Sequence, residues 1–159
     1  MTTIEPAQPA DIVAVRRLAQ LVFAEYGDYA NILPRFFCTQ GVTTFVARVG
    51  KEVVGFIMLG YMPWSGKDHD GEGWMVDLLA LAVEPARQRQ GIGSALMEEL
   101  ARLTQQMAEW RDIKELQLTC AETNEAGLKF FAKHGFAVFD TSHGCYSGGQ
   151  LAWRLKRKP

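Results

Sequence analysis

A run of almost continuous apolar residues, Trp74–Val83, places the tightest constraint on how this chain folds. An apolar run of this length, rich in leucine and valine and without alternation, is typical of a central strand that is buried on both faces. Pro85 ends the strand, since proline cannot donate to a sheet ladder. After a short loop, residues 93–110 carry leucines at helical spacing, which predicts an amphipathic helix. The chain is therefore expected to contain a buried strand, a loop and a helix in direct succession.

The other elements follow from periodicity and from turn residues. The expected segments are a short extended start at Ile4, helices at 11–22, 28–39 and 124–133, a hairpin of strands at 43–49 and 52–59, a loop at 61–73, and strands at 116–120, 136–140 and 150–156. Pro34 is expected to disturb the second helix. The order is βααβββαβαββ. With 159 residues and no linker or repeat, we expect one domain over residues 1–159.

Composition and cysteine usage exclude several classes of protein. The formal net charge is -1, which argues against a nucleic-acid binder, and no apolar run is long enough to cross a membrane. Residues 1–10 lack the features of a signal peptide. Cys38, Cys120 and Cys145 are widely spaced and odd in number, so we expect free thiols in the cytoplasm, and no metal site.

The loop between the buried strand and its helix has the chemistry of an anion site. Gly91 and Gly93 have no Cβ, so the backbone can approach a ligand closely. The helix that follows presents N–H groups and a partial positive charge at its N-terminus, and Arg87 and Arg89 add full charges. A diphosphate fits this arrangement. An ordinary strand–loop–helix turn would look the same, and the third glycine of a dinucleotide fingerprint is missing.

Three stretches resemble motifs of the GNAT superfamily of N-acyltransferases. Residues 88–93 (QRQGIG) resemble its [Gln/Arg]-x-x-Gly-x-[Gly/Ala] acyl-CoA loop, residues 81–85 (LAVEP) its strand lead-in, and residues 124–136 (NEAGLKFFAKHGF) its second motif. The resemblance implies an α/β (α+β) fold. Its sheet would be mixed and mostly antiparallel, with six to seven strands, a splay between the central strands and helices on both faces. It also implies transfer of an acetyl group from acetyl-CoA to an amine, by direct attack in a ternary complex.

The same resemblance assigns residues to acetyl-CoA as co-substrate. Backbone amides of the loop would hold the pyrophosphate, and the central strand would pair through its backbone with the pantetheine arm. Asn124 would hydrogen-bond that arm, although an asparagine that opens a helix also serves as an N-cap. The residues assigned in this way are Leu81, Ala82, Val83, Gln88, Arg89, Gln90, Gly91, Ile92, Gly93, Ser94, Asn124 and Phe131.

Three residues are candidates for proton transfer from the amine. Asp77 stands on the otherwise apolar strand, and its spacing from Gln88 resembles that of the catalytic glutamate in histone-acetylating members of the family. Burial would raise its pKa toward a useful value. A structural carboxylate that binds a backbone N–H or an arginine is an equally good interpretation. Glu122 is the second candidate base. His69 has a suitable pKa, but a solvated loop position explains it as well.

The position that often holds a general acid departs from the family pattern. Many members carry a tyrosine seven residues after the helix-opening asparagine, and here that position is Phe131. Tyr146, in the last loop, is then the candidate acid. Cys120 and Cys145 could be proposed as acyl-carrying nucleophiles, but the direct attack implied by the resemblance disfavours them.

The acceptor is left as a small-molecule or peptide amine. Trp64 and Tyr26 lie in regions that line the acceptor site of relatives, but core packing accounts for them equally well. The acidic stretch 67–72 could attract a cation or simply aid solubility. Two alternatives remain: a non-catalytic acyl-CoA-binding module, and a transferase that uses a longer acyl-CoA. A homodimer is left open, and neither nucleic acid nor a membrane is expected as a partner.

Overall fold

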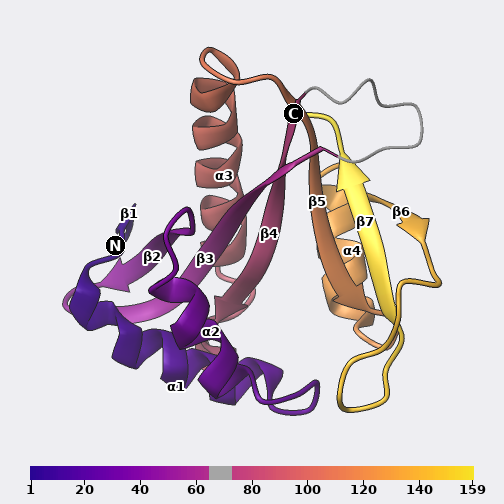
Figure 1. Ribbon diagram of the computed structural model, residues 1–159. Coiled ribbons are helices and arrows are strands. Elements are labelled where there is room, and N and C mark those ends of the chain that lie inside the picture. Colours follow the sequence, from indigo (N-terminus) through magenta and orange to yellow (C-terminus); the bar gives the residue numbers. More distant parts are fainter. Residues whose placement is uncertain (65–72) are drawn as a thin grey trace. The chain divides into compact units, whose positions relative to one another are not determined.

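The computed structural model describes residues 1–64 and 73–159, and its elements follow the predicted order (Figure 1). The strands are β1 (Thr2–Pro6), β2 (Thr43–Val49), β3 (Glu52–Pro63), β4 (Trp74–Val83), β5 (Ile113–Ala121), β6 (Ala137–Asp140) and β7 (Ala152–Arg157). The helices are α1 (Ile12–Phe23), α2 (Tyr29–Phe37), α3 (Ile92–Ala108) and α4 (Glu125–Lys133), with 3₁₀ turns at Pro9–Asp11 and Pro85–Arg87.

The strands form a seven-stranded mixed sheet in the order β1-β2-β3-β4-β5-β7-β6. The pairing of β4 with β5 is parallel, whereas β1/β2, β2/β3, β5/β7 and β6/β7 pair antiparallel. The β4–β5 ladder runs from Trp74 to Leu78, although β4 itself continues to Val83. The predicted fold class is confirmed, and the ladder with β5 ends before β4 does.

The chain divides into two compact units at this same point of β4. Unit 1 comprises Met1–Gly60 and Leu79–Leu100, and unit 2 comprises Tyr61–Leu78 and Ala101–Pro159. The loop between β4 and α3, residues 84–91, which we call the glycine loop, lies entirely within unit 1, and Asp77 lies within unit 2.

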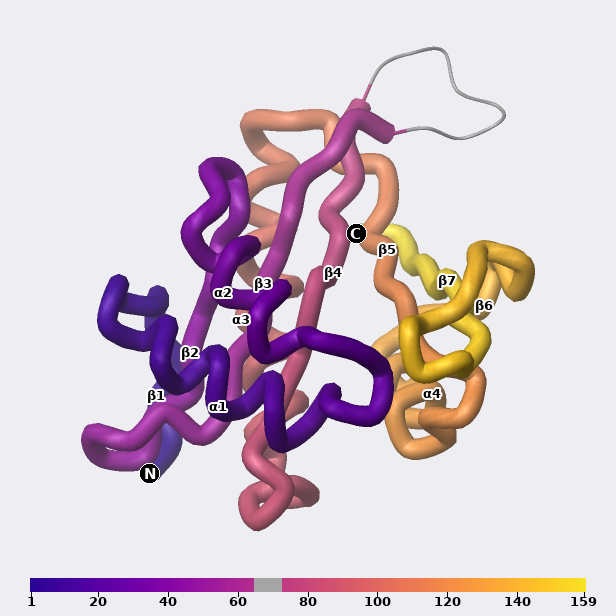
Figure 2. Tube along the Cα trace, turned by 60° about the horizontal axis from the view of Figure 1, so that its bottom comes forward, coloured from indigo at the N-terminus to yellow at the C-terminus, as the bar shows by residue number. Residues whose placement is uncertain are grey.

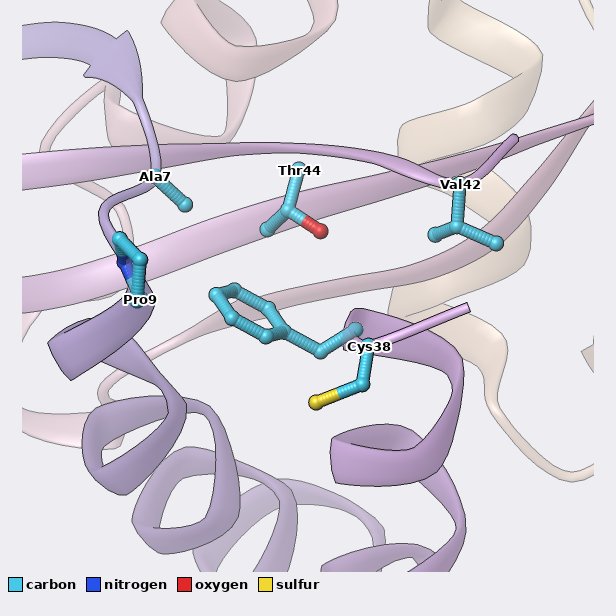
Figure 3. Close-up of a pocket in the computed structure, with 6 residues that line it drawn as sticks. Ala7, Pro9, Cys38, Val42 and Thr44 are labelled. Atoms are coloured by element: carbon cyan, nitrogen blue, oxygen red, sulfur yellow. The ribbon is translucent and has the colours of Figure 1, made fainter. Parts of the chain in front are cut away.

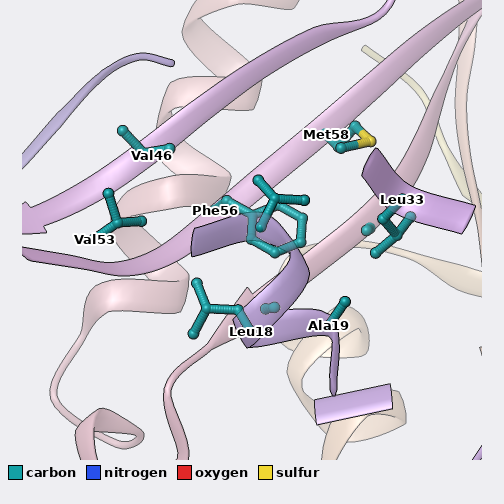
Figure 4. Packing of buried hydrophobic residues seen from close by; sticks show 10 residues of the cluster. Leu18, Ala19, Leu33, Val46, Val53, Phe56 and Met58 are labelled. Carbon is teal, nitrogen blue, oxygen red and sulfur yellow. The ribbon is translucent and has the colours of Figure 1, made fainter. Parts of the chain in front are cut away.

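The core of unit 1 is built by helices on both faces of its strands. Side chains from α1 and α2 pack on one face (Figure 4); among the members of this cluster are Leu18, Ala19, Leu33, Val46, Val53, Phe56 and Met58. Gly55, which precedes Phe56, faces the other way. A Cβ built at Gly55 would lie 2.9 Å from the carbonyl oxygen of Ala82 and 3.4 Å from Leu96 of α3. Only glycine therefore lets α3 and β4 come this close to β3.

Unit 2 separates apolar from polar side chains on its strands. In β5, Leu116, Leu118 and Cys120 are buried on one face, and the intervening residues point to the other. Such alternation is expected because successive side chains of a strand face opposite ways. The segment 141–151 returns the chain from β6 to β7 (Figure 2).

The structure differs from the prediction at several element ends. Residues 61–63 were predicted to be loop, but they extend β3, which ends at Pro63. The backbone N–H of Trp64 then donates to the carbonyl of Gly73 at 3.0 Å. Pro34 lies inside α2, which nevertheless continues to Phe37. Among the described residues, no helix is long and apolar enough to cross a membrane.

Candidate functional site

The glycine loop of unit 1 has an unusual backbone at two positions. Gly91 has a φ of 83°, and Arg89, which carries a Cβ, has a φ of 63°. Both values lie in the left-handed region, where side-chain-bearing residues are disfavoured. Local strain of this kind persists where the surrounding structure enforces it, and it is often found where backbone N–H groups form an anion-binding concavity.

Hydrogen bonds fix the base of this loop to the strands of unit 1. The side-chain amide of Gln88 donates to the carbonyl of Val83 at 3.2 Å, and the N–H of Glu84 donates to the carbonyl of Val54 at 2.8 Å. Arg17 pairs with Glu84 at 3.0 Å. The side chain of Gln88 therefore ties the loop to the end of β4, and Gln88, Arg89 and Gln90 are all exposed.

The N-terminus of α3 is held rigidly beside the loop. Ile92, its first residue, is only 4% exposed and packs at Gly55. The N–H of Ala95 makes a helical hydrogen bond to the carbonyl of Gly91 at 3.0 Å. The first N–H groups of an α-helix generally lack intrahelical acceptors, and α3 begins at Ile92, directly after the loop. This end carries the partial positive charge of the helix dipole.

The outer half of β4 leads directly into the loop. Ala82 is buried, and Leu81 and Val83 are half-buried. Because the β4–β5 ladder ends at Leu78, the backbone of Leu81–Val83 takes no part in it. A strand edge of this kind is suited to pairing with an extended ligand.

In unit 2, Asp77 is a buried carboxylate held by an arginine. Asp77 is 8% exposed, and Nη1 of Arg154 donates to its Oδ1 at 3.3 Å. Burial raises the pKa of Asp77 above 3.8, and Arg154 and, more weakly, His143 offset part of this rise. The carboxyl group therefore has a greater proton affinity than an ordinary aspartate.

Asp77 belongs to a set of polar side chains on one face of β4, β5 and β7. The strand register places Gln117 opposite Asp77, Lys156 opposite Gln117, and Arg154 opposite Thr119. We call this set the polar stripe; its members are Asp77, Glu115, Gln117, Thr119, Arg154 and Lys156. From the sequence only Asp77 had been singled out, although the period-two polar residues of β5 were a usable signal.

The second carboxylate of the polar stripe has the opposite electrostatic character. Burial works to raise the pKa of Glu115, but hydrogen bonds from Gln117, Lys156 and Trp64 lower it overall. The two carboxylates on this face thus have pKa values shifted in opposite directions. In enzymes, neighbouring carboxyl groups with such opposite shifts often take different roles, one as acid and one as base. Of the two, Asp77 is the better proton acceptor.

Two cofactor candidates lie on α4. Asn124 is the N-cap, and its Oδ1 accepts the N–H of Gly127 at 2.9 Å. The capping interpretation is thereby confirmed, and the side-chain amide N–H groups lie outside this bond. Phe131 is half-buried, with its ring 5.4 Å from that of Phe130 and 6.1 Å from that of Phe136 between centroids.

The remaining candidates are Glu122, Tyr146 and two cysteines. Glu122 accepts a long hydrogen bond of 3.4 Å from the N–H of Leu151, and Tyr146 is half-buried in the 141–151 segment. Burial raises the pKa of Cys120 to about 11, so its thiol is a poor nucleophile at neutral pH. Cys145 is an exposed free thiol.

A separate hollow lies elsewhere in unit 1 (Figure 3). It has a volume of about 330 Å³ and is lined by Ala7, Pro9, Phe37, Cys38, Val42 and Thr44. None of these residues was assigned to acetyl-CoA or to proton transfer. His69 and the acidic stretch 67–72 fall outside the described residues. In the described part of the chain, no cluster of His, Cys, Asp and Glu could hold a metal ion.

Comparison with known proteins gives a consistent result. The sequence profile of the acetyltransferase (GNAT) family matches residues 12–136. Ard1 from Thermoplasma volcanium is similar in structure, with 27% identity and a TM-score of 0.77 over 99% of this chain and 97% of that one. No curated protein matches the chain in sequence.

Two more distant structures share the fold. NAA60 of Arabidopsis thaliana in complex with acetyl-CoA has 15% identity and a TM-score of 0.81 over 99% of this chain and 98% of that one. The ribosomal-protein-S18-alanine N-acetyltransferase of Escherichia coli has 19% identity and a TM-score of 0.77, over 99% and 94% respectively.

Proposed function

This chain belongs to the acetyltransferase (GNAT) family and is an acyl-CoA-dependent N-acetyltransferase. We propose that residues 1–159 form one domain, and that it acetylates an amine that attacks acetyl-CoA directly in a ternary complex. The observation that carries the proposal is the backbone of the glycine loop. Arg89 and Gly91 adopt left-handed φ values immediately before the N-terminus of α3. A loop strained in this way beside a helix end is suited to a diphosphate.

Within unit 1, the loop and the strand before it bind different parts of the coenzyme. Backbone N–H groups of 89–94 bind the pyrophosphate, and Gln88 supports the loop through Val83. The backbone of Leu81–Val83 pairs with the pantetheine arm. In unit 2, the side-chain amide of Asn124 donates to the same arm while its Oδ1 continues to cap α4.

Asp77 accepts the proton that the amine must lose. An alkyl amine with a pKa near 10.4 is almost wholly protonated at neutral pH, which costs roughly 4–5 kcal/mol before attack. A buried carboxylate of raised pKa reduces this cost more than an ordinary aspartate does. Because aspartate is short, it acts through a water molecule. Glu122, with its bond to the N–H of Leu151, is the second candidate.

The departing thiolate needs less help. A thiol pKa near 8.5 makes its protonation worth only ~2 kcal/mol at neutral pH. Phe131 cannot supply a proton, so the thiolate leaves unaided or with assistance from Tyr146. Covalent catalysis by Cys120 is not part of the proposal, because burial raises the pKa of its thiol to about 11.

The acceptor is an amine of a peptide or a small molecule. Peptide N-termini are the first class to test, since the similar E. coli protein is by its name a ribosomal-protein-S18-alanine N-acetyltransferase. The free thiols Cys38, Cys120 and Cys145 support a cytoplasmic location.

The proposal is tested by release of free CoA thiol from acetyl-CoA across a panel of peptides, lysine, polyamines and amino acids. We expect turnover with at least one amine, and competition by succinyl- and propionyl-CoA that is weaker than that by acetyl-CoA. Asp77→Asn should lower kcat with the best acceptor by about 10²–10⁴-fold and leave the affinity for CoA unchanged. A loss of less than threefold would reassign Asp77 to a structural role.

A further inference from the structure

Arg154 is a closely held charged side chain of unit 2. It lies on β7, its side chain is 11% exposed, and its guanidinium contacts three other members of the polar stripe. Nη1 donates to the hydroxyl of Thr119 at 2.8 Å, and Nη2 donates to Oε1 of Gln117 at 2.6 Å. These bonds to β5 fix the plane of the guanidinium independently of Asp77. An arginine held in this way presents a preorganised charge.

The contact with Asp77 uses only one carboxylate oxygen. Nη1 of Arg154 is 3.3 Å from Oδ1 of Asp77. Among the described residues, no hydrogen bond reaches the second oxygen, Oδ2. The bond at 3.3 Å is also longer than the two bonds that anchor Arg154 on β5. The guanidinium therefore binds only Oδ1 of Asp77. A bidentate arginine–carboxylate pair would occupy both oxygens.

We propose that Arg154 is a positioning residue for proton transfer: anchored on Thr119 and Gln117, it holds the Asp77 carboxylate through Oδ1 and in its charged form, and it leaves Oδ2 to accept the proton. This rests on the proposed role of Asp77 as the base. A buried carboxylate without a partner would take up a proton and could not act as a base. Arg154 supplies the opposing charge, and β5 supplies the geometry.

Other charged groups that face Asp77 in unit 2 are few. His143, in the segment between β6 and β7, acts on the pKa of Asp77 in the same direction as Arg154 but more weakly. Asp140, at the end of β6, interacts with both Arg154 and His143. The β5 residues that flank the pair, Gln117 and Thr119, are uncharged. Arg154 is therefore the main source of positive charge at Asp77.

The test compares Arg154→Met with Arg154→Lys by the pH dependence of kcat. Loss of the guanidinium favours the protonated form of Asp77, so we expect the acidic limb of the Arg154→Met profile to move to higher pH. At a pH on the wild-type limb, kcat should then fall by about tenfold or more, and the loss should shrink as the pH rises. Arg154→Lys keeps the charge and should restore part of the shift.

Lys156→Met is the matched control. Lys156 lies two residues along β7 on the same face and pairs with Glu115 at 3.3 Å, so this variant removes a cation of the polar stripe that does not touch Asp77. We expect its acidic limb to stay in place. Thermal unfolding and CoA affinity of all three variants show whether the fold and the coenzyme site are retained.

A direct titration separates this inference from the role of Asp77. The ¹³C resonance of the Asp77 carboxyl group, identified by its loss in Asp77→Asn, should titrate at higher pH in Arg154→Met than in the wild type. If Asp77→Asn abolishes turnover but Arg154→Met changes neither the carboxyl titration nor the kcat profile, the role of Arg154 is wrong and that of Asp77 stands. If Asp77→Asn retains full turnover, the assignment of the base is wrong, and with it that of Arg154.

Discussion

Gly91→Ala tests the glycine loop with the smallest possible change. The backbone of Gly91 has a φ of +83°, and a Cβ built there meets nothing within 4 Å. The methyl group therefore makes no clash within the protein, and the cost of the substitution is conformational. An L-residue in the left-handed region costs about 1–2 kcal/mol. Alanine also lowers the entropy of the unfolded chain, which offsets about 0.4–1 kcal/mol of the loss in stability.

The cost can appear in two ways. If the loop keeps its conformation, the free energy of unfolding falls by at most about 1–2 kcal/mol and CoA binding is little changed. If the loop instead relaxes to a negative φ, stability is retained, and CoA must restore the strained backbone when it binds. The dissociation constant of CoA then rises by about 5- to 30-fold. We expect the second outcome, because Gly91 is exposed and has room to move.

Gly50→Ala is the matched control in the same unit. Gly50 turns the chain between β2 and β3 with a φ of +62°, and its Cβ position is equally open. Isothermal titration calorimetry with CoA and thermal unfolding should be measured for both variants. Gly50→Ala should show the conformational cost only in stability, with unchanged CoA affinity. Equal CoA affinity in the wild type and in a relaxed, fully stable Gly91→Ala protein would refute the role of this loop.

Other expectations concern α4, the missing acid and the pH dependence of stability. Asn124→Ala should cost about 1 kcal/mol of stability, because the hydrogen bond that caps the N–H of Gly127 is lost. Asn124→Asp keeps the capping oxygen but loses the side-chain amide, so it should weaken CoA binding without lowering the melting temperature. Phe131→Tyr should leave kcat equal or modestly higher, and Tyr146→Phe should lower kcat less than tenfold, since protonation of the thiolate is worth only ~2 kcal/mol. A hundredfold loss of kcat in Tyr146→Phe would show that Tyr146 serves as the general acid. The folded-state pKa of Asp77 is raised, so its contribution to stability is fully present below about pH 3.8 and is lost as the pH rises through the folded-state pKa. Chemical denaturation over this range should show that slope in the wild type and a flatter dependence in Asp77→Asn.

The elements around the coenzyme loop could be predicted because local signals agree there. The apolar run Trp74–Val83 coincides with β4 from end to end, and Asn124 caps α4 as its position before the helix predicted. The end of β3 could not be predicted in this way. Tyr61 and Met62 suit a strand, but the glycines and prolines nearby suit a loop, and the outcome depends on neighbouring strands that the sequence does not name.

The contact between Asp77 and Arg154 could not be predicted from the sequence, for a different reason. Arg154 is 77 positions away, and the contact depends on the registers of two ladders, β4 with β5 and β5 with β7. A shift of one residue in either ladder would turn a whole strand over and separate the charges. Polar alternation in β5 and β7 was visible, but it does not show which residue of one strand lies beside which residue of the next.

The two interpretations of Asp77 that the sequence left open, a base and a structural partner of an arginine, support each other in the structure. Burial alone favours the protonated form of the carboxyl group, and a protonated carboxyl group cannot accept the proton of the amine. A fully exposed aspartate beside an arginine would be ionised but would bind a proton weakly. Only the combination gives a carboxylate that is charged and still basic. Since each unit of pKa recovers about 1.4 kcal/mol of the roughly 4–5 kcal/mol needed to deprotonate the amine, the balance between burial and Arg154 sets how much Asp77 can contribute. Removing Arg154 should therefore change the pH at which the enzyme works more than it changes the rate at its optimum.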